Sequence, residues 1–172
     1  MAACLLVGGC GSDQSIDAAP NTSPKYSLNR DSFLIEDGEY KSAYSTVFLL
    51  GSASGDLNGD GTLDEVAVLS ENGGGSGTFH YLNVLLGGGV EGLKVVGEKS
   101  LGDRINFDFV DIYGQGSVSR LTGAPIRPDD YGLVVVGYYG HGPRQAPGDI
   151  PEVYVTRHWK IDDGTAVEVK NK

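Results

Sequence analysis

From about Tyr26 onward the sequence consists of short apolar segments separated by turns, and this pattern limits most strongly what the chain can fold into. The 172 residues include 27 glycines, and no long stretch keeps the apolar period of a helix. Frequent turn residues between short apolar runs are typical of many strands joined by tight turns. We therefore predict an all-β, mainly antiparallel domain of roughly seven to ten strands, built as a single curled sheet, a barrel-like fold or a sandwich.

The strand candidates are runs of apolar and β-branched residues that end at turn residues. The nearly continuous apolar run Glu65–Ser70 predicts a central strand, and Gly38 predicts a hairpin turn. Ile105, Phe107 and Phe109 alternate with polar residues, so we expect these three side chains on one face of a strand. The predicted strands are 32–35, 44–50, 65–70, 78–86, 93–96, 104–113, 116–121, 131–139, 152–161 and 166–170.

The net charge of the chain limits its partners. The formal net charge is −10 at pH 7, and the pI is near 4.6. An acidic surface repels phosphate backbones, so we expect no nucleic-acid partner. The same charge fits either a cation-binding surface or a surface that merely keeps the protein soluble.

Both cysteines of the chain, Cys4 and Cys10, lie near its beginning. The predicted domain therefore holds no disulfide and no thiolate site. Small and apolar residues lead directly to the second cysteine, and Val7-Gly8-Gly9-Cys10 resembles the bacterial lipobox. In that motif the cysteine is lipidated and becomes the new N-terminus. The residues that follow, 11–25, are mostly polar and predict a flexible tether.

The lipobox resemblance implies a division of the chain into three parts. Residues 1–9 are expected to belong to a lipoprotein signal peptide, residues 10–25 to the lipidated cysteine and its tether, and residues 26–172 to the β-rich domain. A signal peptide normally opens with basic residues and a longer apolar stretch. We therefore expect the natural start to lie upstream of Met1. A short apolar strand with two incidental cysteines is the alternative interpretation.

The segment Gly55–Glu65 has the most specific pattern in the chain. Oxygen-bearing side chains occupy alternate positions at Asp56, Asn58 and Asp60, so a tightly curled loop can point all three inward. Gly61 follows where such a loop turns sharply, and a residue without Cβ suits that position. Crowded carboxylates repel one another unless a cation neutralises them, and oxygen-only ligands select calcium over zinc or copper.

Two further groups complete this predicted calcium site. The backbone carbonyl of Thr62 follows the turn, and the carboxylate of Asp64 closes the loop. Ala67 stands where an EF-hand has its bidentate glutamate. The pattern is therefore closer to the loops of integrin-type FG-GAP repeats, which it resembles in that a strand follows directly. A metal-free turn is the alternative interpretation, because Asn-Gly and Asp-Gly are also ordinary turn dipeptides. The predicted metal ligands are Asp56, Asn58, Asp60, Thr62 and Asp64.

The order of these parts resembles that of small bacterial lipoproteins of unknown function with a single FG-GAP-like or EF-hand-like calcium loop. A lipobox-like cysteine is followed by a polar tether, the 56–64 loop, an apolar strand and a glycine-rich turn. The resemblance implies a lipid-anchored location in the bacterial cell envelope, facing the periplasm or the exterior. It implies no activity.

Other motifs that resemble catalytic or ligand-binding sites have simpler interpretations. His80, His141 and His158 lie on separate segments without metal-ligand spacing, so we expect three isolated residues. The glycine run 73–77 has neither the lysine nor the helix of a phosphate-binding loop, so we expect a hairpin turn.

Two features remain open as recognition surfaces. Tyr138, Tyr139 and Trp159 fit either the core or an exposed binding face. The loop 140–151 is rich in Gly and Pro, and it fits either a partner-binding loop or a surface loop with no binding role.

The predicted function is a non-catalytic, lipid-anchored binding or structural module of the cell envelope, with one calcium-binding loop. Its expected partners are the membrane, through the N-terminal lipid, and a protein or envelope polymer. An envelope hydrolase that uses the calcium site to position its substrate is the alternative, with Glu65, Glu71 or His80 as general acid or base. A secreted inhibitor that acts through the loop 140–151 is a third hypothesis.

Overall fold

The computed structural model describes residues 23–29, 31–88 and 92–170, and this part of the chain is all-β. Eleven strands are present there, with one short 3-10 helix, η1, at Pro128–Asp130. The strands are β1 (Lys25–Leu28), β2 (Asp31–Leu34), β3 (Glu39–Lys41), β4 (Thr46–Gly55), β5 (Asp64–Asn72), β6 (Phe79–Leu86), β7 (Lys94–Asp103), β8 (Asn106–Ile112), β9 (Val134–Gly140), β10 (Val153–Asp162) and β11 (Thr165–Val169). In the described residues, no helix is long and apolar enough to cross a membrane.

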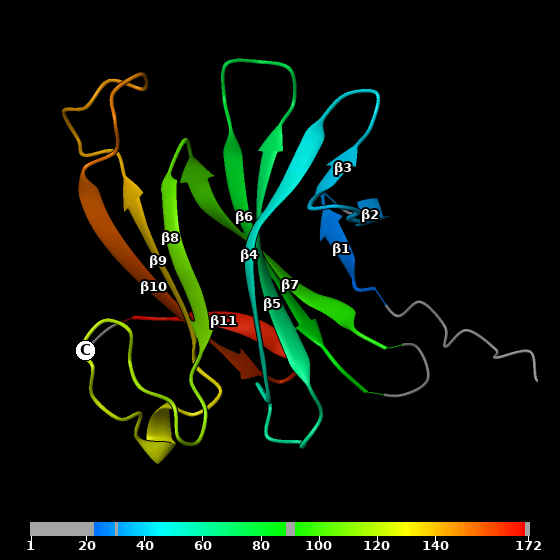
Figure 1. The fold of residues 1–172 in the computed structure, drawn as a ribbon, viewed down its shortest axis with the longest axis vertical. Coiled ribbons are helices and arrows are strands. Elements are labelled where there is room, and N and C mark those ends of the chain that lie inside the picture. The colour runs from blue at the N-terminus through cyan, green and yellow to red at the C-terminus, as the bar shows by residue number, and fades with distance from the viewer. Residues whose placement is uncertain (1–22, 30, 89–91, 171–172) are drawn as a thin grey trace, which may run out of the picture.

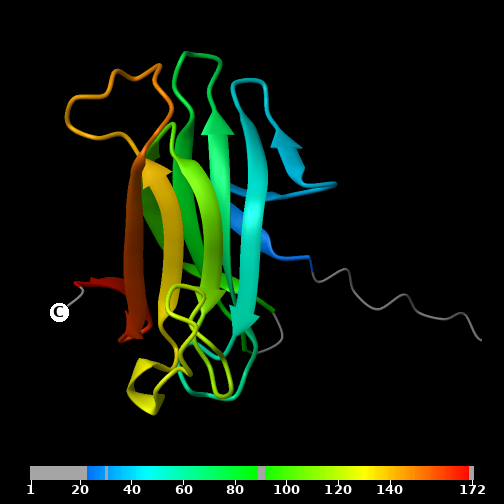
Figure 2. The same ribbon diagram turned by 60° about the vertical axis from the view of Figure 1, so that its left-hand side comes forward.

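The two larger sheets are antiparallel and pack face to face as a sandwich (Figures 1 and 2). One sheet has the strand order β3-β4-β5-β6-β7, and the other has the order β11-β10-β9-β8. The chain passes from the first sheet to the second at Arg104, which adopts a positive φ of 49° between β7 and β8. The prediction of an antiparallel all-β domain is therefore confirmed. The single curled sheet is wrong, because the strands divide into three sheets, and the sandwich alternative fits.

The third sheet is the hairpin of β1 and β2, which covers the outer face of the five-stranded sheet (Figure 1). Tyr26 and Phe33 of the hairpin pack against Ala67 and Leu69 of β5. The Asn83 side chain accepts a hydrogen bond from the Ser27 N–H at 2.7 Å and so fixes the hairpin to β6. These contacts give the five-stranded sheet a second apolar layer.

The main core lies between the two larger sheets. Val66 and Val68 of β5 contribute to it from one side, and Val134 and Val136 of β9 contribute from the other. Trp159 of β10 is fully buried among them. Because the hairpin covers the opposite face, β5 is buried on both faces, as its continuous apolar run predicted.

The predicted common face of Phe107 and Phe109 is wrong. A β-bulge separates these residues in the pairing of β8 with β9. Phe107 therefore packs against the core between the sheets, whereas Phe109 lies on the outer face with Tyr113 and Val135. One extra residue reverses the side-chain alternation beyond it, and the amino-acid pattern carries no sign of the bulge.

The predicted strand 116–121 is also wrong. In this described segment only an isolated bridge between Val118 and Pro125 has strand character. The chain instead forms a compact excursion, in which the N–H of Ser119 donates to the carbonyl of Ala124 at 2.8 Å. The excursion brings Ile126 onto the outer face of the four-stranded sheet, so it covers that sheet as the hairpin covers the other.

The predicted N-terminal features lie outside the described residues. These are the signal-peptide segment 1–9, the lipidation site Cys10 and most of the tether. The domain itself begins with β1 at Lys25, one residue before the predicted boundary. Residues 11–24 therefore separate Cys10 from the first strand.

Candidate functional site

The loop between β4 and β5 closes on itself through hydrogen bonds from its own backbone to its own side chains. Asp56 accepts the N–H of Gly59 at 2.7 Å through Oδ1 and the N–H of Gly61 at 3.0 Å through Oδ2. Asn58 Oδ1 accepts the N–H of Asp60 at 3.1 Å. Asn and Asp side chains stabilise tight turns in this way. The curled loop predicted from the alternating polar residues is therefore present.

Asp60 is an exposed residue of this loop, and its carboxylate accepts hydrogen bonds from residues on both sides of it in sequence. Its Oδ2 accepts a hydrogen bond from the Asn58 amide nitrogen at 2.8 Å, and its Oδ1 accepts the Thr62 N–H at 2.7 Å. These two donors, the Asn58 amide first, lower the pKa of Asp60 below its ordinary value. The same two hydrogen bonds favour the ionised form of the Asp60 carboxylate.

Asp64 is placed differently from the other predicted ligands. Its side chain is 0% exposed. Oδ2 accepts the N–H of Leu57 at 2.7 Å, and Oδ1 accepts the N–H of Gly87 at 2.8 Å. The Asp64 carboxylate therefore ties the beginning of the loop to the residue that follows β6. Hydrogen bonds to a charged acceptor are stronger than neutral ones, so this contact holds the loop against the sandwich.

The loop is also anchored by close packing. Leu57 is buried and belongs to the core between the sheets. Its carbonyl oxygen lies so close to Gly132 that a Cβ at that position would be 2.6 Å from it. Gly132 has a φ of +74°, so both its conformation and its contact require glycine. The segment before β9 is thus fitted directly against the loop.

The loop offers the oxygen ligands that calcium requires, but the predicted ligand residues do not all face the same side of the loop. Asp56, Asn58 and Asp60 are exposed, whereas the Asp64 carboxylate faces backbone N–H groups in the interior. Across residues 23–29, 31–88 and 92–170, no three His, Cys, Asp or Glu side chains are grouped so that they could hold a metal ion. The donors are all oxygens, and each carboxylate has lone pairs beyond those that accept N–H groups.

An open hollow of about 700 Å³ lies beside the loop. The loop residues 56–59 form one part of its wall. Residues 114–115 and 131–132 come from the excursion on the outer face of the four-stranded sheet. Residues 160–161 and 163–164 come from the end of β10 and the turn to β11. Four segments that are distant in sequence therefore meet at this end of the sandwich.

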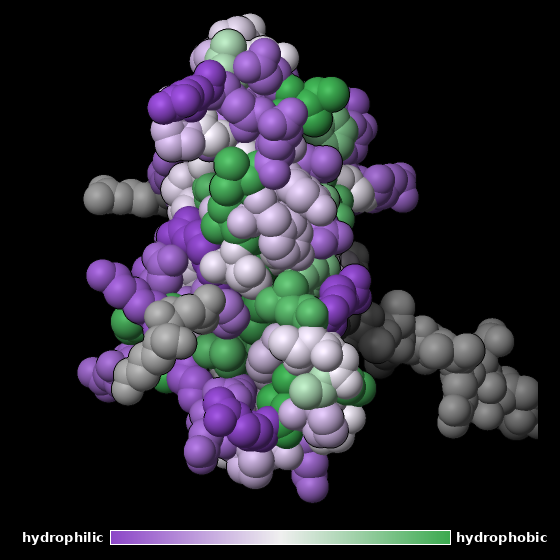
Figure 3. All heavy atoms as spheres, turned by 90° about the vertical axis from the view of Figure 1, so that its left-hand side faces the viewer, coloured by the Kyte–Doolittle hydropathy of each residue, from purple (hydrophilic) through white to green (hydrophobic). Residues whose placement is uncertain are grey.

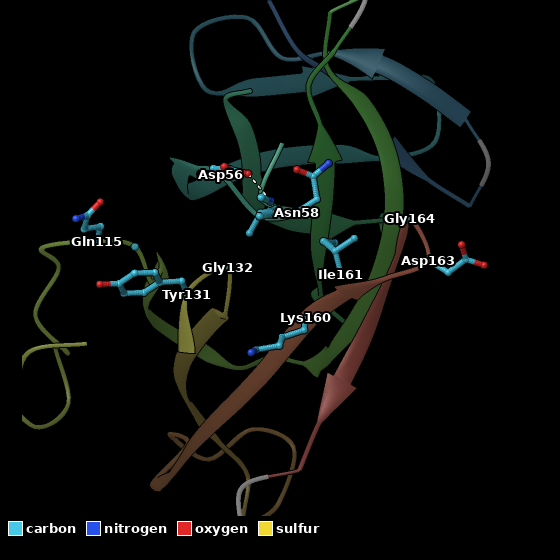
Figure 4. A pocket seen from close by; sticks show the side chains of 12 residues that line it. Asp56, Asn58, Gln115, Tyr131, Gly132, Lys160, Ile161, Asp163 and Gly164 are labelled. Atoms are coloured by element: carbon cyan, nitrogen blue, oxygen red, sulfur yellow. Dashed lines mark hydrogen bonds between the residues drawn. The ribbon is translucent and has the colours of Figure 1, made fainter. Parts of the chain in front are cut away.

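Figure 4 shows how the side chains are arranged around the hollow. Asp56 lies on one side, and Gln115 and Tyr131 lie on a second side. The Lys160 side chain extends toward Tyr131, while the carboxylate of Asp163 points away at the rim. The centre of the hollow is therefore bordered by hydrogen-bonding groups on several sides.

Comparisons with known protein families, with curated proteins and with solved structures found no match for this chain.

The three residues considered as catalytic acids or bases do not gather at the loop. The Glu65 carboxylate accepts the Tyr26 hydroxyl at 2.8 Å, beneath the β1–β2 hairpin. Glu71 and His80 lie near the opposite end of β5 and β6 from the loop, since β5 begins at Asp64. His80 is buried, and this burial lowers its pKa. In the described part of the chain, these three side chains therefore do not form one site beside the loop.

The predicted recognition features have mixed outcomes. Tyr138 and Trp159 are core residues, whereas Tyr139 is 39% exposed and makes an edge-to-face contact with Tyr154 at 4.9 Å between ring centroids. The loop 140–151 is held by its own hydrogen bonds, including two of the Gln145 side chain, which accepts the N–H of Gly142 and donates to the carbonyl of Ile150. The side of the molecule that lies at the left of Figure 1 carries separate hydrophobic patches among hydrophilic surface (Figure 3).

Sequence analysis did not identify the residues that border the hollow opposite the loop. Gln115, Tyr131 and Lys160 have no motif around them, and each reaches the hollow through long-range contacts. Gly132 gave a weak signal, because a glycine directly before the apolar run of β9 indicates a position with a special backbone conformation.

Proposed function

We propose that this chain is a binding module of the bacterial cell envelope, anchored by lipid on Cys10 and carrying one calcium-binding loop at Asp56–Asp64. The observation that carries the proposal is the position of the loop, which forms one wall of an open hollow at the end of a two-sheet sandwich. Loops positioned by a rigid β scaffold commonly hold binding residues. The anchored sandwich would present this end to a partner in the envelope.

The anchoring part of the proposal is supported by the sequence around Cys10. Small residues precede the cysteine, and a polar stretch follows it. Residues 11–24 can span at most about 50 Å when fully extended, at about 3.5 Å per residue. A link of this length allows the sandwich to reach partners at some distance from the membrane surface.

The calcium part of the proposal is supported by the donor set of the loop. Asp56, Asn58 and Asp60 offer oxygen ligands from one exposed turn, and hydrogen bonds within the loop favour the charged form of Asp60 by lowering its pKa. Asp64 supports the loop from inside through Leu57 and Gly87. In this proposal an ion bound on the outside and the Asp64 contacts on the inside rigidify the same loop.

Mass spectrometry of the natural protein from its own membranes tests the anchoring. The mature chain is expected to begin at Cys10, with a mass increase that corresponds to covalent lipid. A Cys10→Ser variant is expected to lose the lipid and to leave the detergent phase, whereas a Cys4→Ser variant is expected to keep both. A mature chain that keeps residues before Cys10 and has an unmodified Cys10 thiol would contradict the proposal.

A further inference from the structure

The hollow beside the 56–64 loop has the size of a small-molecule site. Its volume of about 700 Å³ lies within the range of roughly 300–1,000 Å³ that is typical of such sites. Its wall contains hydrogen-bonding side chains from all the segments that meet there, and the glycines Gly59, Gly114 and Gly164 add no side chain to it. A surface of this kind can make several directional contacts with one ligand.

Two charged groups of the wall, those of Lys160 and Asp56, are already held in position by the protein. The Lys160 ammonium donates to the carbonyl oxygen of Asp129 at 2.7 Å, and the Asp56 carboxylate accepts the N–H groups of Gly59 and Gly61. Each of these groups keeps further donor or acceptor capacity. Because they are fixed before a ligand arrives, little side-chain entropy is lost on binding.

The charged groups of the wall argue against a strongly charged ligand. Two aspartates and one lysine line the hollow, so neither charge is in large excess. The apolar residues Leu57 and Ile161 also line it and are packed against the core. The Tyr131 ring is 37% exposed and can stack on the less polar face of a ligand ring.

We infer that this hollow binds a neutral, polyhydroxylated ligand, one or two sugar units of a glycan. Each hydroxyl group both donates and accepts hydrogen bonds, so a row of hydroxyls matches a wall in which Lys160 and Gln115 donate and Asp56 accepts. The Tyr131 ring supplies the stacking surface. This inference rests on the proposed binding function and names the ligand class of the same site.

Titration calorimetry with the full chain tests the inference. The probes are the trisaccharides chitotriose, cellotriose and maltotriose, with trilysine and citrate as charged probes, all in the presence of calcium. At least one trisaccharide is expected to bind saturably, and neither charged probe is expected to bind. Tyr131→Ala is expected to weaken binding about tenfold through loss of stacking and burial. Gln115→Ala, at an exposed position, is expected to weaken it without changing the melting temperature.

The control is Tyr44→Ala, because Tyr44 is an 88% exposed aromatic residue in the turn between β3 and β4, away from the hollow. This variant is expected to bind like the wild type. The inference is overturned if no trisaccharide binds, or if Tyr131→Ala and Gln115→Ala bind as tightly as Tyr44→Ala. Binding of a charged probe that these two variants weaken would overturn the ligand class and leave the proposed binding function standing.

Discussion

Replacing Asp64 by alanine is expected to lower the free energy of unfolding by about 3 kcal/mol. The substitution leaves the N–H groups of Leu57 and Gly87 without their acceptor, and the Asp64 side chain that satisfied them is fully buried. Each unsatisfied buried polar group costs about 1–3 kcal/mol. For a chain of this length, the loss corresponds to a decrease in melting temperature of about 6–12 °C, measurable by urea or thermal unfolding.

Asp60→Ala is the matched control, because Asp60 belongs to the same loop but is exposed. It removes the carboxylate that accepts hydrogen bonds from the Thr62 N–H and the Asn58 amide. Because the loop is exposed, water can accept these hydrogen bonds instead. The expected loss of stability is below about 1 kcal/mol. Equal destabilisation by the two substitutions would show that the Asp64 carboxylate does not hold the loop to the sandwich.

Gly132→Ala is expected to destabilise the fold by about 3 kcal/mol, from backbone strain and a steric clash together. The residue has a φ of +74°, which alanine adopts with difficulty, and its Cβ would lie 2.6 Å from the carbonyl oxygen of Leu57. Because both atoms in this contact are close to the backbone, relief of the clash requires the loop to move. Equilibrium unfolding in urea measures the loss.

Gly59→Ala separates the two causes. Gly59 has a φ of +80°, but a Cβ there would meet no atom within 4 Å. Its replacement is therefore expected to cost about 1 kcal/mol through strain alone. If Gly132→Ala costs no more than Gly59→Ala, the close packing of the loop against Gly132 contributes nothing to stability.

The features that the sequence predicted well are local ones. The apolar run of β5 indicated a strand buried on both faces, and Gly38 indicated the turn in which Asp37 and Gly38 adopt positive φ angles of 52° and 83°. The alternation of Asp56, Asn58 and Asp60 indicated the curled loop. In each case, the residues that determine the structure are neighbours in sequence.

The features that the sequence predicted poorly depend on contacts between residues that are far apart in the chain. The spacing predicts Asp64 as a metal ligand but gives no sign of its hydrogen bond to Gly87, which depends on the pairing of β5 with β6. The short strands β1 and β3 have little pattern of their own, because packing and pairing with other strands stabilise them. Gln115, Tyr131 and Lys160 belong to the four-stranded sheet and its loops, and they come to face the 56–59 segment of the other sheet only when the two sheets pack. Sequence spacing does not reveal that these residues are close to the loop.

Calcium-dependent thermal unfolding of the full chain tests the central claim most directly. With a dissociation constant of about 10⁻³ M, as in extracellular calcium modules, 10 mM calcium is expected to stabilise the folded chain by about 1.4 kcal/mol. The melting temperature is then expected to rise by about 3–6 °C relative to chelator-treated protein. Asp60→Ala is expected to abolish this rise, whereas Asp108→Ala, at an exposed position on β8, is expected to keep it. An unchanged melting temperature of the wild-type protein in 10 mM calcium would contradict the claim that the 56–64 loop binds the ion.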